Sequence, residues 1–368
     1  MSTPSIWHKL YNGETNVEFI GRWKLWFALS GLLILVGVGS LTTRGLNLGI
    51  EFEGGVSWQV PVGDSDVASM RGVVEGEGLS ATVQTVGTGD SERLRIRAQV
   101  EDDTDVASIS EVIAAEAGVA LDEVTVQSVS ESWGDEISSK AQRALIIFLL
   151  LVTLYITLRF EWKMAAATVL ALAHDVLVTV GLYSIFSFEV TPATVVAILT
   201  ILGFSIYDGI VVFDRIDENA KALAIAGGRT YSRMVNDSMN EVLMRTLNTS
   251  ITALLPILSL LVLGSLVMGA TTLQDFSLAL FIGLAAGAYS SIFIASPALA
   301  LLKEREERWR QMRERVERLD RRAAPPVTAA VEVPSAVSAA PPDRGPAPPP
   351  SAPPPIQARG RKKQGRRK

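Results

Sequence analysis

An acidic side chain inside an apolar stretch is the feature of this sequence that points most directly to chemistry. Asp208 lies in VVAILTILGFSIYDGIVVFDRIDEN, residues 195–219, which is hydrophobic over most of its length. An ionised carboxylate near the centre of a bilayer costs about 2.5–3.5 kcal/mol, and intramembrane acids commonly mark ion pathways and proton relays. We therefore expect a functional role for Asp208. The alternative is a polar contact that only holds helices together.

Arg245, in LMRTLNTS at the start of the next apolar stretch, is the nearest basic candidate for a partner of Asp208. Asp208 lies 14 residues after Thr194, or about 21 Å along a helix. This depth is comparable to that of Arg245 on the following helix, so an ion pair between the two is geometrically possible. The alternative is that Arg245 extends to the membrane interface.

Three further ionisable residues lie in or beside apolar stretches. His174 and Asp175, in LALAHDVLVTVG, could extend a proton path because histidine titrates near neutral pH, or they could bond to neighbouring helices. Asp214 lies where the stretch around Asp208 ends, and we interpret it as an ordinary boundary charge.

Composition excludes several other kinds of site. The chain has no cysteine and two histidines, so thiolate or histidine-rich metal sites and a cysteine nucleophile are excluded. It has no G-x-x-x-x-G-K-[ST] loop, which argues against an ATP-driven pump. We find no catalytic motif and expect neither an enzyme nor a cofactor.

Six apolar stretches must position these side chains. The chain is 48% hydrophobic with a mean hydropathy of +0.29, a balance typical of a multi-span membrane protein. The stretches are 25–41, 144–158 with an extension upstream, 165–186, 194–213, 246–266 and 276–302. Residues 1–24 lack the small-x-small site of a cleaved signal peptide, so the first stretch is expected to remain as an anchor.

The connections alternate in charge. Basic residues gather before the first stretch, after the second, after the fourth and after the sixth, whereas the loops after the third and fifth carry only Glu189 and Asp275. The positive-inside rule places both termini in the cytoplasm. The predicted organisation is a cytoplasmic segment 1–24, a first span 25–41, an extracytoplasmic domain 42–140, five spans within 141–302 with a cytoplasmic loop 214–245, a charged cytoplasmic helix 303–322 and a disordered tail 323–368.

The outer segment 42–140 has 19 acidic and six basic residues and is long enough for a small core. Its periodicity predicts strand, helix, strand, strand, helix, strand, the order of a ferredoxin-like α+β domain. The strands are expected at 56–62, 81–89, 93–100 and 122–132, and the helices at 66–78 and 103–118. It contains no histidine and no phosphate loop, which favours a binding or mechanical role.

The end of the chain is rich in proline and alanine and finishes in RGRKKQGRRK. Such a composition cannot bury enough surface to fold. The basic run could attract anionic lipid or RNA, or it could be a solvated tail.

Seven motifs resemble the SecF family, the SecF subunits of bacterial SecDF protein-export complexes. They occur in the family's order from residue 17 to residue 302: VEFIGRWKLWFALSG, LNLGIEFEGG, YITLRFEWKMA, LAHDV, GFSIYDGIVVFDRIDEN, RTLNTSITAL and GAYSSIFIASP.

The resemblance implies one half of a twelve-helix body related to resistance-nodulation-division exporters, the other half being SecD. It implies association with the SecYEG channel, with YajC-like and YidC-like membrane proteins and with the translocating preprotein, and use of the proton gradient at the plasma membrane. The family's proton-pathway aspartate and arginine fall on Asp208 and Arg245.

The sequence departs from the family pattern at two positions. Gly209 replaces a frequent threonine after the aspartate, and Glu51 replaces a frequent aspartate in the outer motif. Two other functions stay open at this point: half of a small-molecule or lipid exporter, and a passive scaffold of the export channel.

Overall fold

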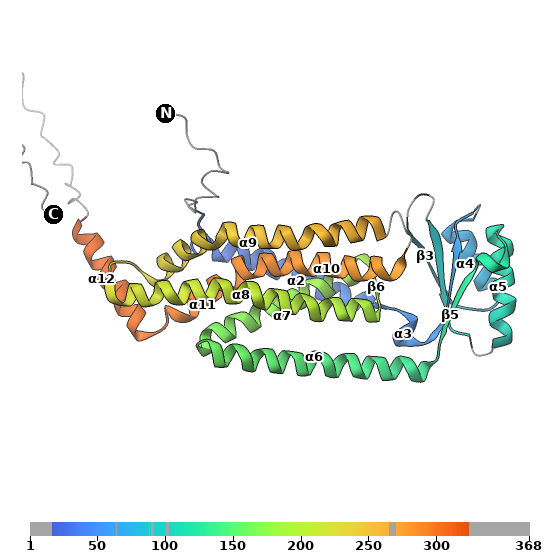
Figure 1. The fold of residues 1–368 in the computed structure, drawn as a ribbon, viewed down its shortest axis with the longest axis horizontal. Helices are drawn as coiled ribbons and strands as arrows, with labels where there is room; N and C mark the ends of the chain where they lie inside the picture. Colours follow the sequence, from blue (N-terminus) through green and yellow to red (C-terminus); the bar gives the residue numbers. More distant parts are fainter. Residues whose placement is uncertain are drawn as a thin grey trace, which may run out of the picture. The chain divides into compact units, whose positions relative to one another are not determined.

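The computed structural model describes residues 17–323, apart from 64, 88, 90–91, 101–102 and 265–269. In this part, six helical spans are long and apolar enough to cross a membrane, as predicted, and they run side by side along the long axis (Figure 1). They are α2 (Trp23–Arg44), α6 (Glu131–Arg159), α7 (Trp162–Phe186), α8 (Pro192–Ala226), α9 (Tyr231–Val262) and a sixth span, Thr271–Lys303.

The sixth span is interrupted by a π-helical turn. It consists of α10 (Thr271–Ser290), η4 (Ser291–Ala295) and α11 (Ser296–Lys303). The hydroxyl of Ser296 donates to the carbonyl of Ser291, five residues earlier, and Pro297 lies at the start of α11. A π turn widens the helix locally and often occurs at functional sites.

Helix α8 carries Asp208 and is longer than a bilayer requires. Thr191 and Thr194 form a capping box at its first turn, Pro192 occupies the first helical position, and Gly227 ends it with φ +64°. Its 35 residues extend about 52 Å. A helix of this length is longer than the hydrocarbon region of a bilayer, which is about 30 Å thick.

The segment 214–245, predicted as a loop, is mostly helix. Helix α8 continues to Ala226 and α9 begins at Tyr231, so only residues 227–230 connect them. The hydroxyl of Thr230 accepts from the amide of Arg233 and caps α9. Both helices extend beyond their apolar parts, α8 at its C-terminal end and α9 at its N-terminal end. Hydropathy alone therefore does not mark where a helix begins or ends.

Close helix contacts depend on small residues at two places in the bundle. A Cβ atom on Gly283 would lie 2.1 Å from Cδ1 of Ile201 on α8. A similar contact joins the first and third spans, where a Cβ on Gly37 would lie 2.7 Å from Cα of Gly181. Glycine at these positions allows the backbones to approach as closely as they do.

The outer domain has the predicted ferredoxin-like topology. Its sheet has the order β3-β4-β2-β5, with every pair antiparallel, and two helices cover one face (Figure 1). Trp58, Met70 and Ile113 are buried between sheet and helices. The elements are β2 (Gly55–Pro61), α4 (Val67–Gly76), β3 (Ala81–Val86), β4 (Arg93–Ala98), α5 (Asp103–Ala117), η2 (Leu121–Glu123) and β5 (Thr125–Val129).

A short strand pairing between the outer domain and the spans was absent from the sequence-based prediction. Strand β1 (Asn47–Leu48) pairs in parallel with β6 (Glu189–Val190), directly before α8. Helix α3 (Ile50–Glu53) follows β1 and leads into β2. Two-residue strands carry too little periodicity to be recognised from sequence.

The predicted charged helix is present as α12 (Glu307–Ala323). It is held by Trp309, which is buried against Tyr231 with ring centroids 4.8 Å apart. The predicted tail and most of the predicted segment 1–24 lie outside the described residues.

Candidate functional site

Asp208 lies half-buried on α8, at the meeting point of three spans. The hydroxyl groups of Thr246 on α9 and Ser291 in η4 lie next to its carboxyl group. Among the described residues, neither Oδ2 of Asp208 nor Oγ1 of Thr246 has a hydrogen-bond partner, although both atoms are buried. A buried polar atom without a protein partner is costly, and such atoms are few in native proteins.

A small cavity opens beside the Asp208 carboxyl group. Its volume of about 20 Å³ is sufficient for one water molecule. The hydroxyl groups of Ser205, Thr249 and Ser250 line one part of it, and Phe204 and Tyr207 line another. Tyr207 is exposed, so the cavity lies close to the outer surface of the bundle.

Asp175 is connected to the same region through Ser205. The Ser205 hydroxyl donates to Oδ2 of Asp175 at 2.6 Å, and Nδ1 of His174 lies 3.1 Å from Oδ1. Asp175 is 1% exposed. Ser205 precedes Asp208 by three residues, so the two share a face of α8. Ser205 and Asp208 thus line the same small cavity, and Ser205 bonds to Asp175, which in turn contacts His174.

Gly287 makes this arrangement possible. A Cβ atom at position 287 would lie 3.3 Å from Cβ of Ser205 and 3.6 Å from Oδ2 of Asp175. A larger side chain at position 287 would press on Ser205, which forms the hydrogen bond to Asp175.

The expected ion pair between Asp208 and Arg245 is absent from this structure. Arg245 is exposed, and no ion pair joins it to Asp208 among the described residues. The next residue, Thr246, faces Asp208 instead. The position of Arg245 along α9 is close to that expected, because its neighbour Thr246 lies beside Asp208. Successive residues of a helix point about 100° apart, so the position along a helix does not tell which residue faces a neighbouring helix.

Asp214 forms an exposed ion pair with Arg159 at 3.4 Å, in agreement with its interpretation as a boundary charge. The hydroxyl groups of Ser205, Thr246 and Ser291 were missed as members of the site. The available signal for Ser205 was its helical spacing from Asp208; Thr246 and Ser291 have no comparable signal because they come from other helices.

The comparisons with known proteins agree on one family. Residues 109–305 match protein export membrane protein SecD/SecF, C-terminal, and residues 39–65 match the SecD/SecF GG motif. The chain is 41% identical to protein translocase subunit SecF of Streptomyces coelicolor, over 84% of this chain and 82% of that protein. The SecF of Mycobacterium tuberculosis is 38% identical, over 85% of this chain and 73% of that protein.

A solved structure matches as well. The crystal structure of SecDF, a translocon-associated membrane protein from Thermus thermophilus, aligns with a TM-score of 0.71 and 32% identity. The aligned region covers 80% of this chain but only 39% of the SecDF chain. The present chain thus spans about two fifths of that larger protein.

Proposed function

The chain belongs to the SecD/SecF family of protein export membrane proteins, with an accessory role in protein export, and from this premise we propose a function for its intramembrane site. Together with a SecD-type companion, the chain uses the proton gradient to promote Sec-dependent translocation of polypeptides across the plasma membrane. Asp208 carries the proton. The relatives are named translocase subunits, in keeping with a transport role rather than a catalytic one.

The observation that carries this proposal is the half-buried carboxyl group of Asp208, whose Oδ2 has no hydrogen-bond partner among the described residues. A protonated carboxyl can donate to a hydroxyl oxygen such as that of Thr246, whereas an ionised one can only accept and carries a charge that is costly inside the membrane. A proton crossing 100 mV supplies about 2.3 kcal/mol. This energy is sufficient to shift a balance between two helix arrangements that differ in the charge on Asp208.

Arg245 keeps a place in the proposed cycle. It adjoins Thr246, so a rotation of α9 by roughly one residue's angle, about 100°, exchanges the hydroxyl for the guanidinium beside Asp208. We propose that the structure represents the arrangement suited to a neutral Asp208, and that ionisation favours the one with Arg245 turned inward. Ser205, Asp175 and His174 extend the path that a proton takes.

The partners follow from the family and from the coverage. Because the chain corresponds to two fifths of a fused SecDF, we propose that a SecD-type chain supplies the other half and that the pair associates with the SecYEG channel. YajC-like and YidC-like proteins and the preprotein belong to the same proposed assembly. Residues 42–140 face the outside in this arrangement, and both termini face the cytoplasm.

The decisive test replaces Asp208 by asparagine, which keeps the shape and removes the titratable group. We expect Asp208→Asn to abolish the part of export that depends on the proton gradient, while the membrane level of the chain and the recovery of its companion stay unchanged. Asp214→Asn is the matched control, because Asp214 is an exposed carboxylate on the same helix. Export that persists in Asp208→Asn would rule out the carrier role and favour a passive scaffold.

A further inference from the structure

The face of the outer sheet that points away from α4 and α5 carries two arginines. Arg95 and Arg97 alternate along β4 with Leu94 and Ile96, which are buried against the helices. Yet the two arginines are also buried, at 6% and 8% exposure. An arginine buried on the outside of a small domain requires a partner from elsewhere in the chain.

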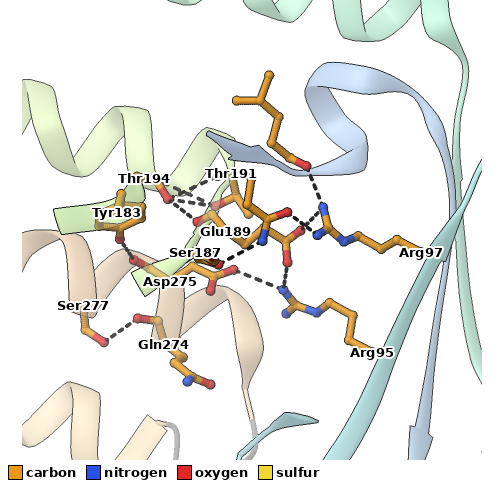
Figure 2. A network of polar contacts seen from close by, with 12 residues as sticks. Arg95, Arg97, Tyr183, Ser187, Glu189, Thr191, Thr194, Gln274, Asp275 and Ser277 are labelled. Atoms are coloured by element: carbon orange, nitrogen blue, oxygen red, sulfur yellow. Dashed lines mark hydrogen bonds and ion pairs between the residues drawn. The ribbon is translucent and has the colours of Figure 1, made fainter. Parts of the chain in front are cut away.

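An acidic residue between two spans and one at the start of the sixth span supply these partners, as Figure 2 shows. Nη1 of Arg95 lies 2.7 Å from Oε2 of Glu189 on β6 and 3.6 Å from Oδ2 of Asp275 on α10. Arg97 lies 3.5 Å from Oε1 of Glu189 and donates to the carbonyl of Leu48 at 2.5 Å and to Oδ1 of Asn47 at 2.6 Å. We call Arg95, Arg97, Glu189 and Asp275 the outer joint.

The two acids lie at the outer ends of the spans that surround Asp208. Glu189 precedes α8 by three residues, and the hydroxyl of Thr194 in the first turn of α8 reaches the Glu189 carbonyl at 3.5 Å. Asp275 lies in the second turn of α10, the span that continues into Ser291. The outer joint thus connects one strand of the outer domain to both α8 and the sixth span.

The electrostatics favour a firm connection. Burial lowers the pKa of the Arg95 guanidinium, but Glu189 and Asp275 more than offset this effect, so its pKa is raised. Arg95 therefore stays charged throughout the physiological range. Removing one member of a buried ion pair leaves the other charge uncompensated, so the outer domain and the helix ends gain from remaining together.

We propose that the outer joint transmits movements of α8 and the sixth span to the outer domain, so that Arg95 and Arg97 act as positioning residues for export. This proposal rests on the proposed function, since it assumes that the charge on Asp208 shifts these helices. Without the outer joint, the attachments that remain among the described residues include the two chain connections, the short pairing of β1 with β6 and hydrogen bonds near them, such as that from Asn47 to the Ser187 carbonyl.

A spin-label measurement tests the joint without using export. The chain has no cysteine, so Glu111→Cys on α5 and Phe186→Cys at the end of α7, both exposed, are its only thiols. In the companion-bound complex we expect a narrow distance distribution between the labels. Arg95→Gln/Arg97→Gln should broaden it about twofold or more, whereas Arg93→Gln on the same strand should leave it unchanged. An unchanged width in the double variant overturns the proposal.

Export provides the second readout. We expect Arg95→Gln/Arg97→Gln to reduce gradient-dependent export about tenfold while Asp208 and the companion interaction are intact. A disulfide across β1 and β6, from Leu48→Cys/Val190→Cys at paired positions, should restore export in the double variant until it is reduced. The matched disulfide Gln59→Cys/Thr125→Cys joins β2 to β5 inside the domain and should not. Equal rescue by both disulfides, or by neither, contradicts transmission through the joint.

The two proposals fail in different ways. If Asp208→Asn leaves export unchanged while the double variant still broadens the label distances, the proton role is wrong and the joint remains as an anchor. If Asp208→Asn abolishes export and the label distances do not respond to the double variant, the proton role stands and the joint is wrong.

Discussion

At the scale of single residues, Ser205 has the most informative position in the site. Its hydroxyl donates to Asp175 at 2.6 Å while its helix presents Asp208 three residues later. Asp175 is fully buried, and the ring of His174 is stacked on Tyr289 with centroids 5.9 Å apart. Ser205 therefore adjoins both acids: it donates to Asp175 and lines the same small cavity as Asp208.

Replacing Ser205 separates the two acids. We expect Ser205→Ala to lower stability by about 1–3 kcal/mol, because the buried carboxyl group of Asp175 loses the hydrogen bond that Ser205 donates to it, and to slow gradient-dependent export. Thermal unfolding in detergent and export in vesicles measure these effects. Ser205→Thr keeps the hydroxyl and should be milder. Thr200→Ala is the matched control, since that hydroxyl is exposed and bonds only to its own helix. An equal response of both alanine variants would contradict the assignment.

Sequence reasoning at this scale found the charged residues but not their surroundings. Asp208 was recognisable because a carboxylate in an apolar stretch has an evident energetic cost. The hydroxyl groups beside it were not, because serine and threonine are common in membrane helices and become informative only once the facing residue is known. The same limit explains Arg245, whose depth was foreseen and whose direction was not.

At the scale of elements, glycines of the sixth span allow its close crossing with α8, and the tightest contact is at Gly283. Gly283 admits the side chain of Ile201, and the site around Asp208 lies about two turns farther along both helices. The crossing and the site therefore lie on the same pair of helices.

Widening this crossing should damage the protein through packing alone. We expect Gly283→Ala to lower stability by about 1–3 kcal/mol, because a Cβ there overlaps Ile201. Gly203→Ala on α8 is the control: nothing lies within 4 Å of its Cβ position, so it should be neutral or stabilising by up to about 1 kcal/mol. Thermal unfolding of both variants checks the prediction, and equal melting temperatures would refute it.

Elements with strong periodicity were predictable, and those without were not. The alternation in RLRIRA indicated β4 correctly, and the same alternation placed three of the outer segment's six basic residues on one face. Glu189 and Asp275 stood out as lone acids in their connections. Their meeting could not be foreseen, because it depends on how the outer domain sits on the helix ends, which neither pattern encodes.

At the scale of the whole molecule, the proposed orientation places the outer domain on one side of the membrane and the connection between α8 and α9 on the other. Apolar side chains are widely exposed on α2 and α6, including Leu35 at 71% and Leu158 at 79%. In water such surfaces would be costly, whereas lipid or a companion chain covers them.

Single cysteines can test this orientation. We expect Glu111→Cys in the outer domain to react with a membrane-impermeant maleimide in cells whose plasma membrane is intact and whose outer envelope layers have been made permeable to the reagent. Lys221→Cys, near the cytoplasmic end of α8, should react only after the inner membrane is lysed. Both side chains are exposed in the structure, so a difference in labelling reports on which side of the membrane each position lies. The reverse pattern of labelling would invert the proposed topology.

The outer joint also dictates an order of biosynthesis. Glu189 is synthesised 94 residues after Arg95, and Asp275 follows Arg95 by 180 residues. At about 5–20 residues per second, the last partner is completed roughly 9–36 s after β4. During that interval the outer domain, with its own core, has to exist with two hydrated arginines on its open face. The joint therefore forms in two stages: Glu189 can close on the arginines first, and the joint is complete only after the start of the sixth span has been made.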